Sequence, residues 1–488
     1  MSDKLIYIPN WISGKKVAST NGEWLDKHNP HNGRLMSKVA ASSKEDVDNA
    51  VDAARKSFCE WSETTPVRRG QILLDIVARM KQRAGEMAAC IAVETGKPPQ
   101  DAQGEVAGAI LQGEYFAGEG MRLHGRSLTS AVPGKYSHTV RQPRGIAGLI
   151  VPANTPIANL AWKTFPALIC GNTIVIKAAE DSPQIAIIFA EIAKEAGLPD
   201  GVMNVIQGSG ANAGTAIVEN PNISIISFTG STIVGRSIAA TAGKRLARVS
   251  LELGGKNPFV VCDDADIEKA VHWAALSAFS NAGQRCAAGS RLIVFNDVYE
   301  EFRNKLVAKA KLLKLGVAPG DDLGPVINKR QHLSIIGAIS KAIEDGGTVL
   351  CGGKAPENIG LSEGYYIEPT VIEGLAPSSD LCRHEIFGPV AILLPVNTME
   401  EALKLANDSE YGLTSSIHTS NVDRAMWFAQ RVKAGVANVN LGTYGSEPHM
   451  PFGGFGSSSN GTREPGVEAL DVYSELKNIT FLTRTDRI

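Results

Sequence analysis

Apolar residues at helical spacing mark the first predicted element of this 488-residue chain. From Ser42 onward they fall on one face of a helix: Val47, Ala50, Val51, Ala54 and Phe58. Ser42 and Glu45 have the spacing of a capping box, so we expect the helix to begin there. A second helix should start at Thr65-Pro66, because proline is favoured in a first helical turn, and the helical region should stop by Gly96.

After Gly145 the pattern changes to short β-rich runs that alternate with helical segments. The predicted strands are 146–151, 173–177, 202–206 and 223–228, and the predicted helices are 183–196 and 232–242. This alternation is the sequence form of βαβ units, which build a mostly parallel sheet. We therefore expect an α/β fold with a doubly wound domain of the dinucleotide-binding type.

A second α/β series follows Gly255, with a strand at 258–262, a helix at 267–280 and a later strand at 436–439. The segments 122–142 and 478–488 fit neither series and have the polar, β-prone character of strands that leave the body. The unpaired backbone groups at the edges of such strands usually pair with another subunit. We therefore expect a small β oligomerisation ribbon and a homodimer or homotetramer. The predicted division is 1–121 and 143–254 for the dinucleotide-binding domain, 255–455 for the catalytic domain, and 122–142 with 470–488 for the ribbon.

Composition narrows the range of partners. Hydrophobic residues make up 43% of the chain and charged residues 20%, with a formal net charge of −2, so we expect no nucleic-acid partner. The N-terminus carries Asp3, Lys4 and Pro9 where a secretory signal needs an apolar core. The longest apolar stretch, 145–176, is interrupted by proline, asparagine and lysine, so we predict no membrane span.

The seven cysteines indicate a reducing compartment. Their number is odd, they are widely spaced, and they form no CxxC pair, which favours the cytoplasm over a disulfide framework. No Cys/His cluster has metal-ligand spacing, and we predict no metal site.

Three separated residues are typical of thiol catalysis. Cys286 follows Gly283, which allows close backbone approach, and Arg285, which adds positive charge, although a lone cysteine is more often an inert thiol. Glu252 ends a β-prone run and is a candidate base, since no histidine lies within ten residues of Cys286; the alternative is a salt-bridged surface glutamate. Asn154 lies between a strand and a helix. Its side-chain amide can donate to an oxyanion, and the alternative is that it only caps the helix or forms a turn.

Strand ends also carry candidate cofactor contacts. Segment 228–232 ends a strand and opens a helix, where free amides and the helix dipole favour a phosphate. Lys177 and Glu180 end another strand, and a glutamate that reaches an adenosine ribose repels a 2′-phosphate, which favours NAD over NADP. A solvated Lys/Glu pair is the alternative there. The glycine run 208–214 is better explained as a turn than as a phosphate loop.

These motifs resemble the aldehyde dehydrogenase superfamily in the expected order over nearly the whole chain. The matching segments are 151–156, 176–180, 228–235, 252–256, 283–286, 385–389 and 451–454. The resemblance implies a cofactor domain, a catalytic domain and an oligomerisation ribbon, with NAD as cofactor and NADP as the alternative. It implies Cys286 as nucleophile, Asn154 as oxyanion donor and Glu252 as base. It also implies Lys163 and Glu464 as a proton-relay pair.

The resemblance further implies which residues contact the cofactor. Lys177 and Glu180 would hold the adenosine ribose and Ser231 the pyrophosphate. Glu385 and Phe387 would hold the nicotinamide half. The full predicted set is Val151, Pro152, Lys177, Glu180, Phe228, Gly230, Ser231, Val234, Leu253, Glu385 and Phe387. Ala153 and Ala178 stand where tryptophan and proline are usual, so we expect a more open wall on this side.

Segment 451–466 looks closest to the semialdehyde-oxidising branch of the superfamily. The predicted substrate pocket is lined by Asn159, Trp162, Arg285, Tyr444, Ser446, Glu447 and His449. This set is more polar than a fatty-aldehyde tunnel needs, so we predict a small polar aldehyde.

The predicted reaction is NAD-dependent oxidation of an aldehyde to a carboxylic acid through a cysteine thiohemiacetal and a thioester. Glu252, as the residue that activates water, argues against a CoA-acylating enzyme and more weakly against a reductive enzyme of acyl phosphates. A catalytically silent, crystallin-like protein would tolerate loss of Cys286, Glu252 or Asn154, yet all three are present.

Overall fold

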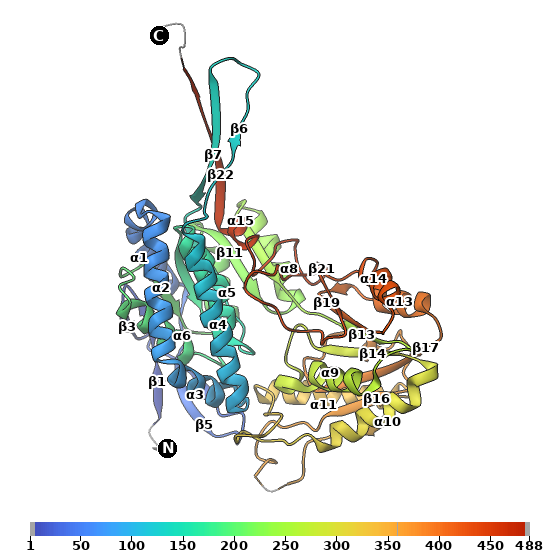
Figure 1. Ribbon diagram of the computed structural model, residues 1–488. Coiled ribbons are helices and arrows are strands. Elements are labelled where there is room, and N and C mark those ends of the chain that lie inside the picture. Colours follow the sequence, from blue (N-terminus) through green and yellow to red (C-terminus); the bar gives the residue numbers. More distant parts are fainter. Residues whose placement is uncertain (1–4, 359, 484–488) are drawn as a thin grey trace.

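The computed structural model describes residues 5–358 and 360–483. Two seven-stranded sheets form the centres of two lobes, and a three-stranded ribbon stands out from one end of the body (Figure 1). A further small sheet lies near the N-terminus and contains β1 (Ile6–Ile8), β5 (Leu35–Ala40) and β4 (Trp24–His28) in that order.

The first large sheet has the strand order β12-β11-β8-β9-β10-β2-β3. Its strands are β2 (Asn10–Ile12), β3 (Lys15–Val17), β8 (Ile146–Ile150), β9 (Thr173–Lys177), β10 (Met203–Ile206), β11 (Ile223–Thr229) and β12 (Arg248–Glu252). Strands β8 to β12 run parallel, whereas β2 and β3 join as antiparallel neighbours. The carboxyl ends of parallel strands meet at one edge, so Lys177, Thr229 and Glu252 end on the same side of the sheet.

Helices cover both faces of this sheet. One face carries α5 (Pro156–Ile169) and α6 (Gln184–Glu195), and the other carries α1 (Lys44–Glu63), α7 (Thr215–Glu219) and α8 (Thr232–Gly243). Successive side chains of β8 alternate between the two cores: Ala147 and Leu149 belong to the core with α5, and Ile146 and Ile150 to the core with α1. A strand buried on both faces requires this near-continuous apolar sequence.

A third layer of helices lies outside α5 and contains α2 (Pro66–Gln82), α3 (Ala84–Thr95) and α4 (Pro99–Glu119). Helix α4 packs against α2, α3 and α5. A Cβ atom at Gly113 would lie 2.5 Å from Val77 and 2.7 Å from Phe165, so glycine is what lets α4 approach this closely.

The second large sheet has the order β15-β16-β17-β14-β13-β19-β20, and β15 is its antiparallel edge strand. Its strands are β13 (Asn257–Val261), β14 (Gly289–Phe295), β15 (Thr348–Cys351), β16 (Thr370–Glu373), β17 (Val390–Val396), β19 (Thr414–His418) and β20 (Val436–Val439). The helices of this lobe are α9 (Ile267–Phe279), α10 (Asn296–Leu312), α11 (Lys329–Glu344), α12 (Asp380–Arg383), α13 (Met399–Asn407) and α14 (Val422–Ala429). A short pairing of β18 (Tyr411–Gly412) with β21 (Phe455–Gly456) brings the chain back toward the first lobe.

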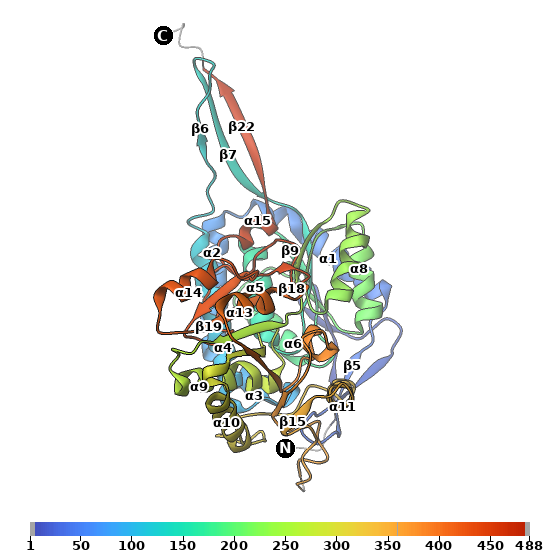
Figure 2. The same ribbon diagram turned by 90° about the vertical axis from the view of Figure 1, so that its right-hand side faces the viewer.

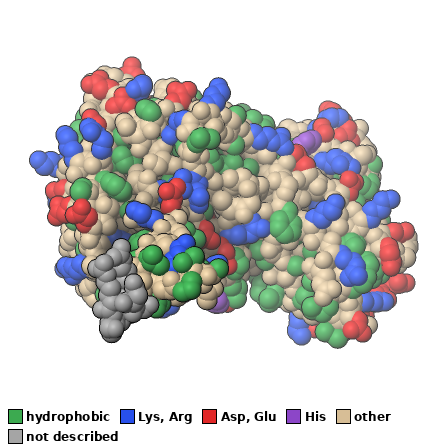
Figure 3. All heavy atoms as spheres, turned by 90° about the horizontal axis from the view of Figure 1, so that it is seen from above, with side chains coloured by type: hydrophobic (Ala, Val, Ile, Leu, Met, Phe, Trp, Pro, Cys, Tyr) green, Lys and Arg blue, Asp and Glu red, His purple; other side chains and the backbone are tan. Residues whose placement is uncertain are grey.

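The projecting ribbon joins two distant parts of the sequence. Strand β22 (Ser474–Leu482) pairs antiparallel with β7 (Lys135–Pro143) along its whole length, and β6 (Ser127–Leu128) pairs with the other edge of β7 (Figure 2). Apolar side chains of the ribbon are exposed, and green side chains gather around its tip when it is seen from above (Figure 3). The most exposed are Leu128, Val132, Tyr136, Leu476, Phe481 and Leu482.

The predicted α/β elements are observed with shifts of one or two residues at their ends. The predicted capping box at Ser42 and Glu45 is wrong by one residue, because the backbone N–H of Ser43 donates to Asp46 Oδ2 at 2.8 Å and α1 begins at Lys44. The division into three domains stays a prediction, and its residues 1–4 and 484–488 lie outside the described part of the chain. Within the described part, every helix is too short or too polar to cross a membrane.

Candidate functional site

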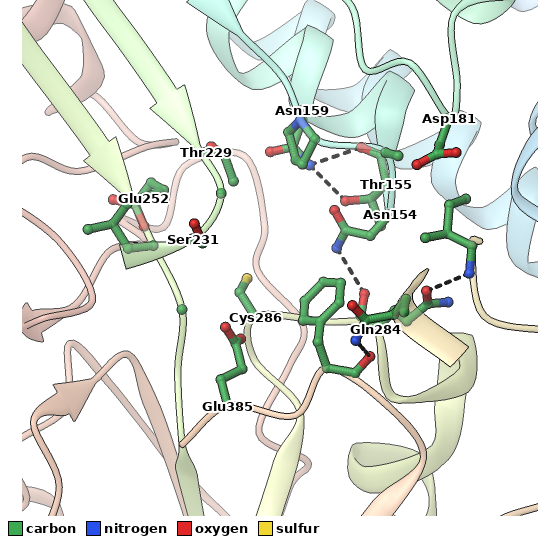
Figure 4. Close-up of a pocket in the computed structure, with 18 of the residues that line it drawn as sticks. Asn154, Thr155, Asn159, Asp181, Thr229, Ser231, Glu252, Gln284, Cys286 and Glu385 are labelled. Carbon is green, nitrogen blue, oxygen red and sulfur yellow. Dashed lines mark hydrogen bonds between the residues drawn. The ribbon is translucent and has the colours of Figure 1, made fainter. Parts of the chain in front are cut away.

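A cavity of about 430 Å³ opens between the two lobes, at the carboxyl edge of the first sheet. Such a volume lies in the range of small-molecule sites. Asn154, Ser231 and Glu252 line it from the first lobe, and Cys286 and Glu385 line it from the second. In the close-up, the Cys286 sulfur points into the open centre with Glu252 on one side and Asn154 on the other (Figure 4).

The backbone before Cys286 is held in an unusual conformation. After α9 the chain makes a short 3₁₀ turn, and Asn281, Ala282 and Gly283 have φ angles of 54°, 53° and 68°. A Cβ atom at Gly283 would lie 2.1 Å from the carbonyl oxygen of Gly388, so both φ and space require glycine there. Because Asn281 and Ala282 are not glycine, their left-handed backbone conformation costs free energy, so the surrounding packing must hold the loop firmly.

Burial raises the pKa of the Cys286 thiol to about 12, and the nearby carboxyl groups of Glu385 and Glu252 add to the increase. The sulfur is therefore a neutral thiol at neutral pH, and attack on a carbonyl requires loss of its proton. The side chain is only half buried, so the sulfur stays accessible from the cavity.

Asn154 lies in the loop between β8 and α5. Its side-chain Nδ2 donates to the carbonyl oxygen of Gln284 at 2.9 Å, which links it to the loop of Cys286. A primary amide has two N–H groups, so this bond orients the second one for a ligand. Gln284 is fixed in turn, because its Oε1 accepts from the backbone N–H of Ile327 at 2.9 Å.

Glu252 is the last residue of β12 and is almost completely buried. Neither of its carboxylate oxygens has a hydrogen-bond partner among the described residues. Burial, and then the charge of Glu464, raises the pKa of Glu252 well above its ordinary value. An unpartnered buried carboxyl group with a raised pKa is suited to accept a proton from water.

Lys163 and Glu464 form a buried ion pair behind Glu252. Lys163 Nζ lies 2.7 Å from Glu464 Oε2, and both side chains are fully inaccessible. The hydroxyl groups of Ser227 and Ser250 donate to Glu464 Oε1 at 2.7 Å and 2.8 Å. The predicted pairing of Lys163 with Glu464 is thus observed as a contact, and its role as a proton relay stays a prediction.

Six of the eleven predicted cofactor residues line the cavity: Pro152, Gly230, Ser231, Leu253, Glu385 and Phe387. Ser231 is the N-cap of α8, a helix of 12 residues, so the backbone N–H groups of its first turn face this side. A Cβ atom at Gly254 would lie 2.4 Å from Glu385 Oε2, so glycine brings the main chain close to that carboxyl group. Burial raises the pKa of Glu385 to about 7.

Ser231 at the N-terminus of α8, together with Gly254 and Glu385, fits a dinucleotide bound along this side of the cavity.

The other predicted cofactor residues lie outside the cavity lining. Lys177 Nζ donates to Glu180 Oε2 at 2.6 Å at the end of β9. Burial acts to raise the pKa of Glu180, but the Lys177 ammonium outweighs it and holds this pKa below its ordinary value. Val151 and Phe228 are buried, and Val234 is exposed on α8.

The predicted substrate residues divide into two groups. Asn159 and Trp162 line the cavity, and the Trp162 ring lies 5.4 Å from the ring of Phe452, which also lines it. Arg285, Tyr444, Ser446, Glu447 and His449 are not part of the lining. The Arg285 guanidinium instead lies 4.9 Å from the centre of the Tyr444 ring. Substrate contact by these five residues stays a prediction.

Several residues at the site were not predicted from the sequence. Asp181 and Asn328 line the cavity from opposite lobes, and Asn328 Nδ2 donates to Asp181 Oδ2 at 2.7 Å. Lys97, Glu105 and Asn281 contact the loop of Asn154. All seven cysteines are free, and the described residues contain no cluster of three acidic, His or Cys side chains that could hold a metal.

The fold and the site define a class: an α/β protein in which a cysteine, an amide and a buried carboxyl group line one cavity at the edge of a dinucleotide-type sheet. The model of the aldehyde dehydrogenase family matches residues 16–479, and the chain therefore belongs to that family. The predicted family and α/β fold are confirmed.

Relatives and solved structures match over nearly their full length. An alpha-ketoglutaric semialdehyde dehydrogenase of Bacillus subtilis is 38% identical, covering 96% of this chain and 97% of the relative. The corresponding Haloferax volcanii enzyme is also 38% identical, covering 96% and 98%. The solved structure of PnpE in complex with nicotinamide adenine dinucleotide has a TM-score of 0.95 at 38% identity, covering 97% of each chain. A betaine aldehyde dehydrogenase of Staphylococcus aureus in complex with NAD+ has a TM-score of 0.95 at 33% identity, covering 97% and 94%.

Proposed function

We propose that the protein oxidises an aldehyde to a carboxylate with NAD as hydride acceptor and with Cys286 as nucleophile. The observation that carries the proposal is that Cys286, Asn154 and Glu252 meet in one cavity whose other wall is the N-terminus of α8. The test is formation of NADH from NAD by the purified protein, without coenzyme A, on addition of aldehyde. If NADH forms only when coenzyme A is present, the hydrolytic mechanism is wrong.

In the first half-reaction the Cys286 sulfur bonds to the carbonyl carbon, and the thiol proton passes to solvent water. The carbonyl oxygen becomes an oxyanion, which accepts hydrogen bonds from Asn154 Nδ2 and from the backbone N–H of Cys286. Bound NAD supplies the acceptor for the hydride of the substrate carbon. Loss of that hydride leaves the carbon as a thioester of Cys286.

In the second half-reaction Glu252 accepts a proton from a water molecule whose oxygen bonds to the thioester carbon. The C–S bond then breaks, the carboxylic acid is released, and the Cys286 thiolate takes up a proton from solvent water. The raised pKa of Glu252 suits this role, because a stronger base accepts the water proton more readily. Glu464, which faces Glu252 from the Lys163 pair, is a candidate to receive the proton next.

We further propose that Glu180 sets the preference for NAD. Its carboxylate is held charged beside Lys177, where it would accept hydrogen bonds from ribose hydroxyls and repel a 2′-phosphate. Glu180→Gln is expected to raise kcat/KM with NADP relative to NAD about 10-fold, by removing roughly 1.4 kcal/mol of repulsion. Initial rates with both nucleotides measure this ratio. An unchanged ratio would mean that Glu180 does not face the ribose.

The substrate is proposed to be a small polar aldehyde, such as a semialdehyde. Two relatives at 38% identity carry names of this kind, and Asn159 contributes a polar group to the cavity beside Trp162. Initial rates with short semialdehydes, hydroxyaldehydes, aromatic aldehydes and long alkyl aldehydes provide the test. A strong preference for the long alkyl members would contradict the proposal.

We also propose that the ribbon joins copies of this chain into a homodimer or homotetramer, in the cytoplasm, where Cys286 stays reduced. Ile479 and Phe481 are apolar and exposed on β22, and Phe481 stacks on Tyr136 at 5.5 Å. Ile479→Asp combined with Phe481→Asp is expected to give a smaller species in sedimentation velocity, because charges at an apolar interface are costly to bury. Glu475→Asp on the same strand is the control. An unchanged sedimentation coefficient would remove this face of the ribbon from the interface.

A further inference from the structure

A buried ion pair lies next to the loop that carries Asn154. Lys97, in the turn between α3 and α4, has its Nζ 2.5 Å from Glu105 Oε2 on α4, and the two side chains are 3% and 5% exposed. Burying two charges costs free energy that their attraction does not always return, so such a pair is weak evidence for a stabilising role. Its remaining contacts indicate what it does.

Both partners bond to the segment that begins with Asn154. Lys97 Nζ donates to the carbonyl oxygen of Asn154 at 2.8 Å. Glu105 Oε1 accepts from the backbone N–H groups of Ile157 at 2.9 Å and Ala158 at 3.3 Å, in the first turn of α5. One ion pair therefore holds this segment at Asn154 and again three residues later, at Ile157. The N–H groups of a first helical turn lack partners within the helix, so a carboxylate there fixes the helix end as well.

The loop that leads into Cys286 also binds the carbonyl oxygen of Asn154. Asn281 Nδ2 donates both to the carbonyl oxygen of Asn154 and to that of Gln284, each at 3.2 Å. The carbonyl oxygen of Gln284 also accepts from Asn154 Nδ2. The Asn154 peptide is thus a junction between the Lys97–Glu105 pair and the chain that leads into Cys286.

We propose that Lys97 and Glu105 are positioning residues that fix the Asn154 amide at the distance and angle from Cys286 that the oxyanion requires; this rests on the proposed function. An oxyanion donor is effective only when it is held in place before the reaction, since a shift of a fraction of an ångström weakens the bond that forms in the transition state. Neither residue is part of the cavity lining. Their loss acts on the step in which an oxyanion develops.

The test uses the double variant Lys97→Met/Glu105→Gln, which removes both charges together and leaves no buried charge unpaired. Two rates are compared on the full-length protein with NAD bound. The first is single-turnover NADH formation from aldehyde, which passes through an oxyanion. The second is alkylation of Cys286 by iodoacetamide, in which sulfur displaces iodide from carbon and no oxyanion develops. The control is Lys81→Met/Glu114→Gln, which removes a 2.5 Å pair between α2 and the same helix α4.

The double variant is expected to slow NADH formation about 10-fold or more, approaching the loss for one oxyanion donor, and to change alkylation less than about 2-fold. Combined with Asn154→Ala, it should add little further loss, because both changes remove the same interaction. If this variant does not fold, Lys97→Gln/Glu105→Gln gives the same comparison, since it also leaves no buried charge unpaired and places two amides that are able to hydrogen-bond each other where the ion pair was.

Three outcomes would overturn the inference: an equal loss in both rates, losses that multiply with Asn154→Ala, or a rate of NADH formation equal to that of the control. If the unaltered protein forms no NADH with any aldehyde, the proposed function fails and this inference fails with it. Normal oxidation in the unaltered protein combined with any of the three outcomes rejects the positioning role alone.

Discussion

Cys286→Ser is expected to lower the rate of NADH formation from aldehyde by at least about 10³-fold, the size of loss typical when a covalent nucleophile is removed. Serine matches cysteine in shape but is a far weaker nucleophile, and the described residues that line the cavity include no histidine to activate it. The measurement is single-turnover absorbance of NADH with enzyme in excess over aldehyde. Binding of NAD by calorimetry should be unchanged, because the sulfur contributes no charge to the cleft at neutral pH.

Cys59→Ser is the matched control, since Cys59 is a free cysteine exposed on α1. It should leave NADH formation within about 2-fold of the unaltered rate, as surface substitutions usually do. Retention of full oxidation by Cys286→Ser would show that another group attacks the aldehyde. The covalent mechanism would then have to be abandoned.

The second large effect is expected for Glu252→Gln, which should leave one equivalent of NADH per site but reduce steady-state turnover about 10²–10⁴-fold. Glutamine fills the same buried space and cannot accept a proton from water, so the thioester on Cys286 accumulates. Mass spectrometry of the quenched protein should find the acyl group on the peptide that contains Cys286. The amplitude of the burst is the criterion, since its rate also depends on how the thiol loses its proton.

The raised pKa of Glu252 gives this step a direction with pH. The carboxylate is the active form, so turnover of the unaltered protein should rise as pH increases through that raised pKa and fall as Glu252 becomes protonated. The stoichiometric burst of Glu252→Gln should lack this dependence. Normal turnover by Glu252→Gln at neutral pH would show that the base is another residue.

The three central residues of the site could be predicted because each is marked by a short, contiguous sequence motif. Asn154, Glu252 and Cys286 each sit in a short motif at a strand end or tight turn, and parallel strands bring such ends to one edge. Their convergence in one cavity follows from the topology. Their roles stay predictions until the variants above are measured.

Lys97 and Glu105 could not be predicted, because a lysine and a glutamate eight positions apart look like solvated surface residues. Only the packing of α4 against α5 buries them and gives them the Asn154 loop as a partner. For the same reason the sequence does not tell which of the polar residues around Tyr444 reach the cavity, since that depends on how a long loop folds back.

The predicted start of α1 is wrong for a different reason. Ser42 and Ser43 each precede an acidic residue by three positions, so the sequence offers two equivalent capping boxes. Tertiary contacts decide between them: the Ser42 hydroxyl donates to Asn10 Oδ1 at 2.8 Å, which leaves Ser43 to begin the helix. The prediction that the helical region stops by Gly96 is wrong, because Gly96 ends only α3 and Pro99 is the first residue of α4.

The pairing of Lys163 with Glu464 has a consequence for biosynthesis. The two residues are 301 positions apart in the sequence, so the ribosome synthesises Lys163 long before Glu464. Burying the lysine without its partner would leave an uncompensated charge, so the first lobe reaches its final packing only after Glu464 has been synthesised. Chains that end before Glu464 should therefore be inactive, because the buried ion pair behind Glu252 cannot form in them.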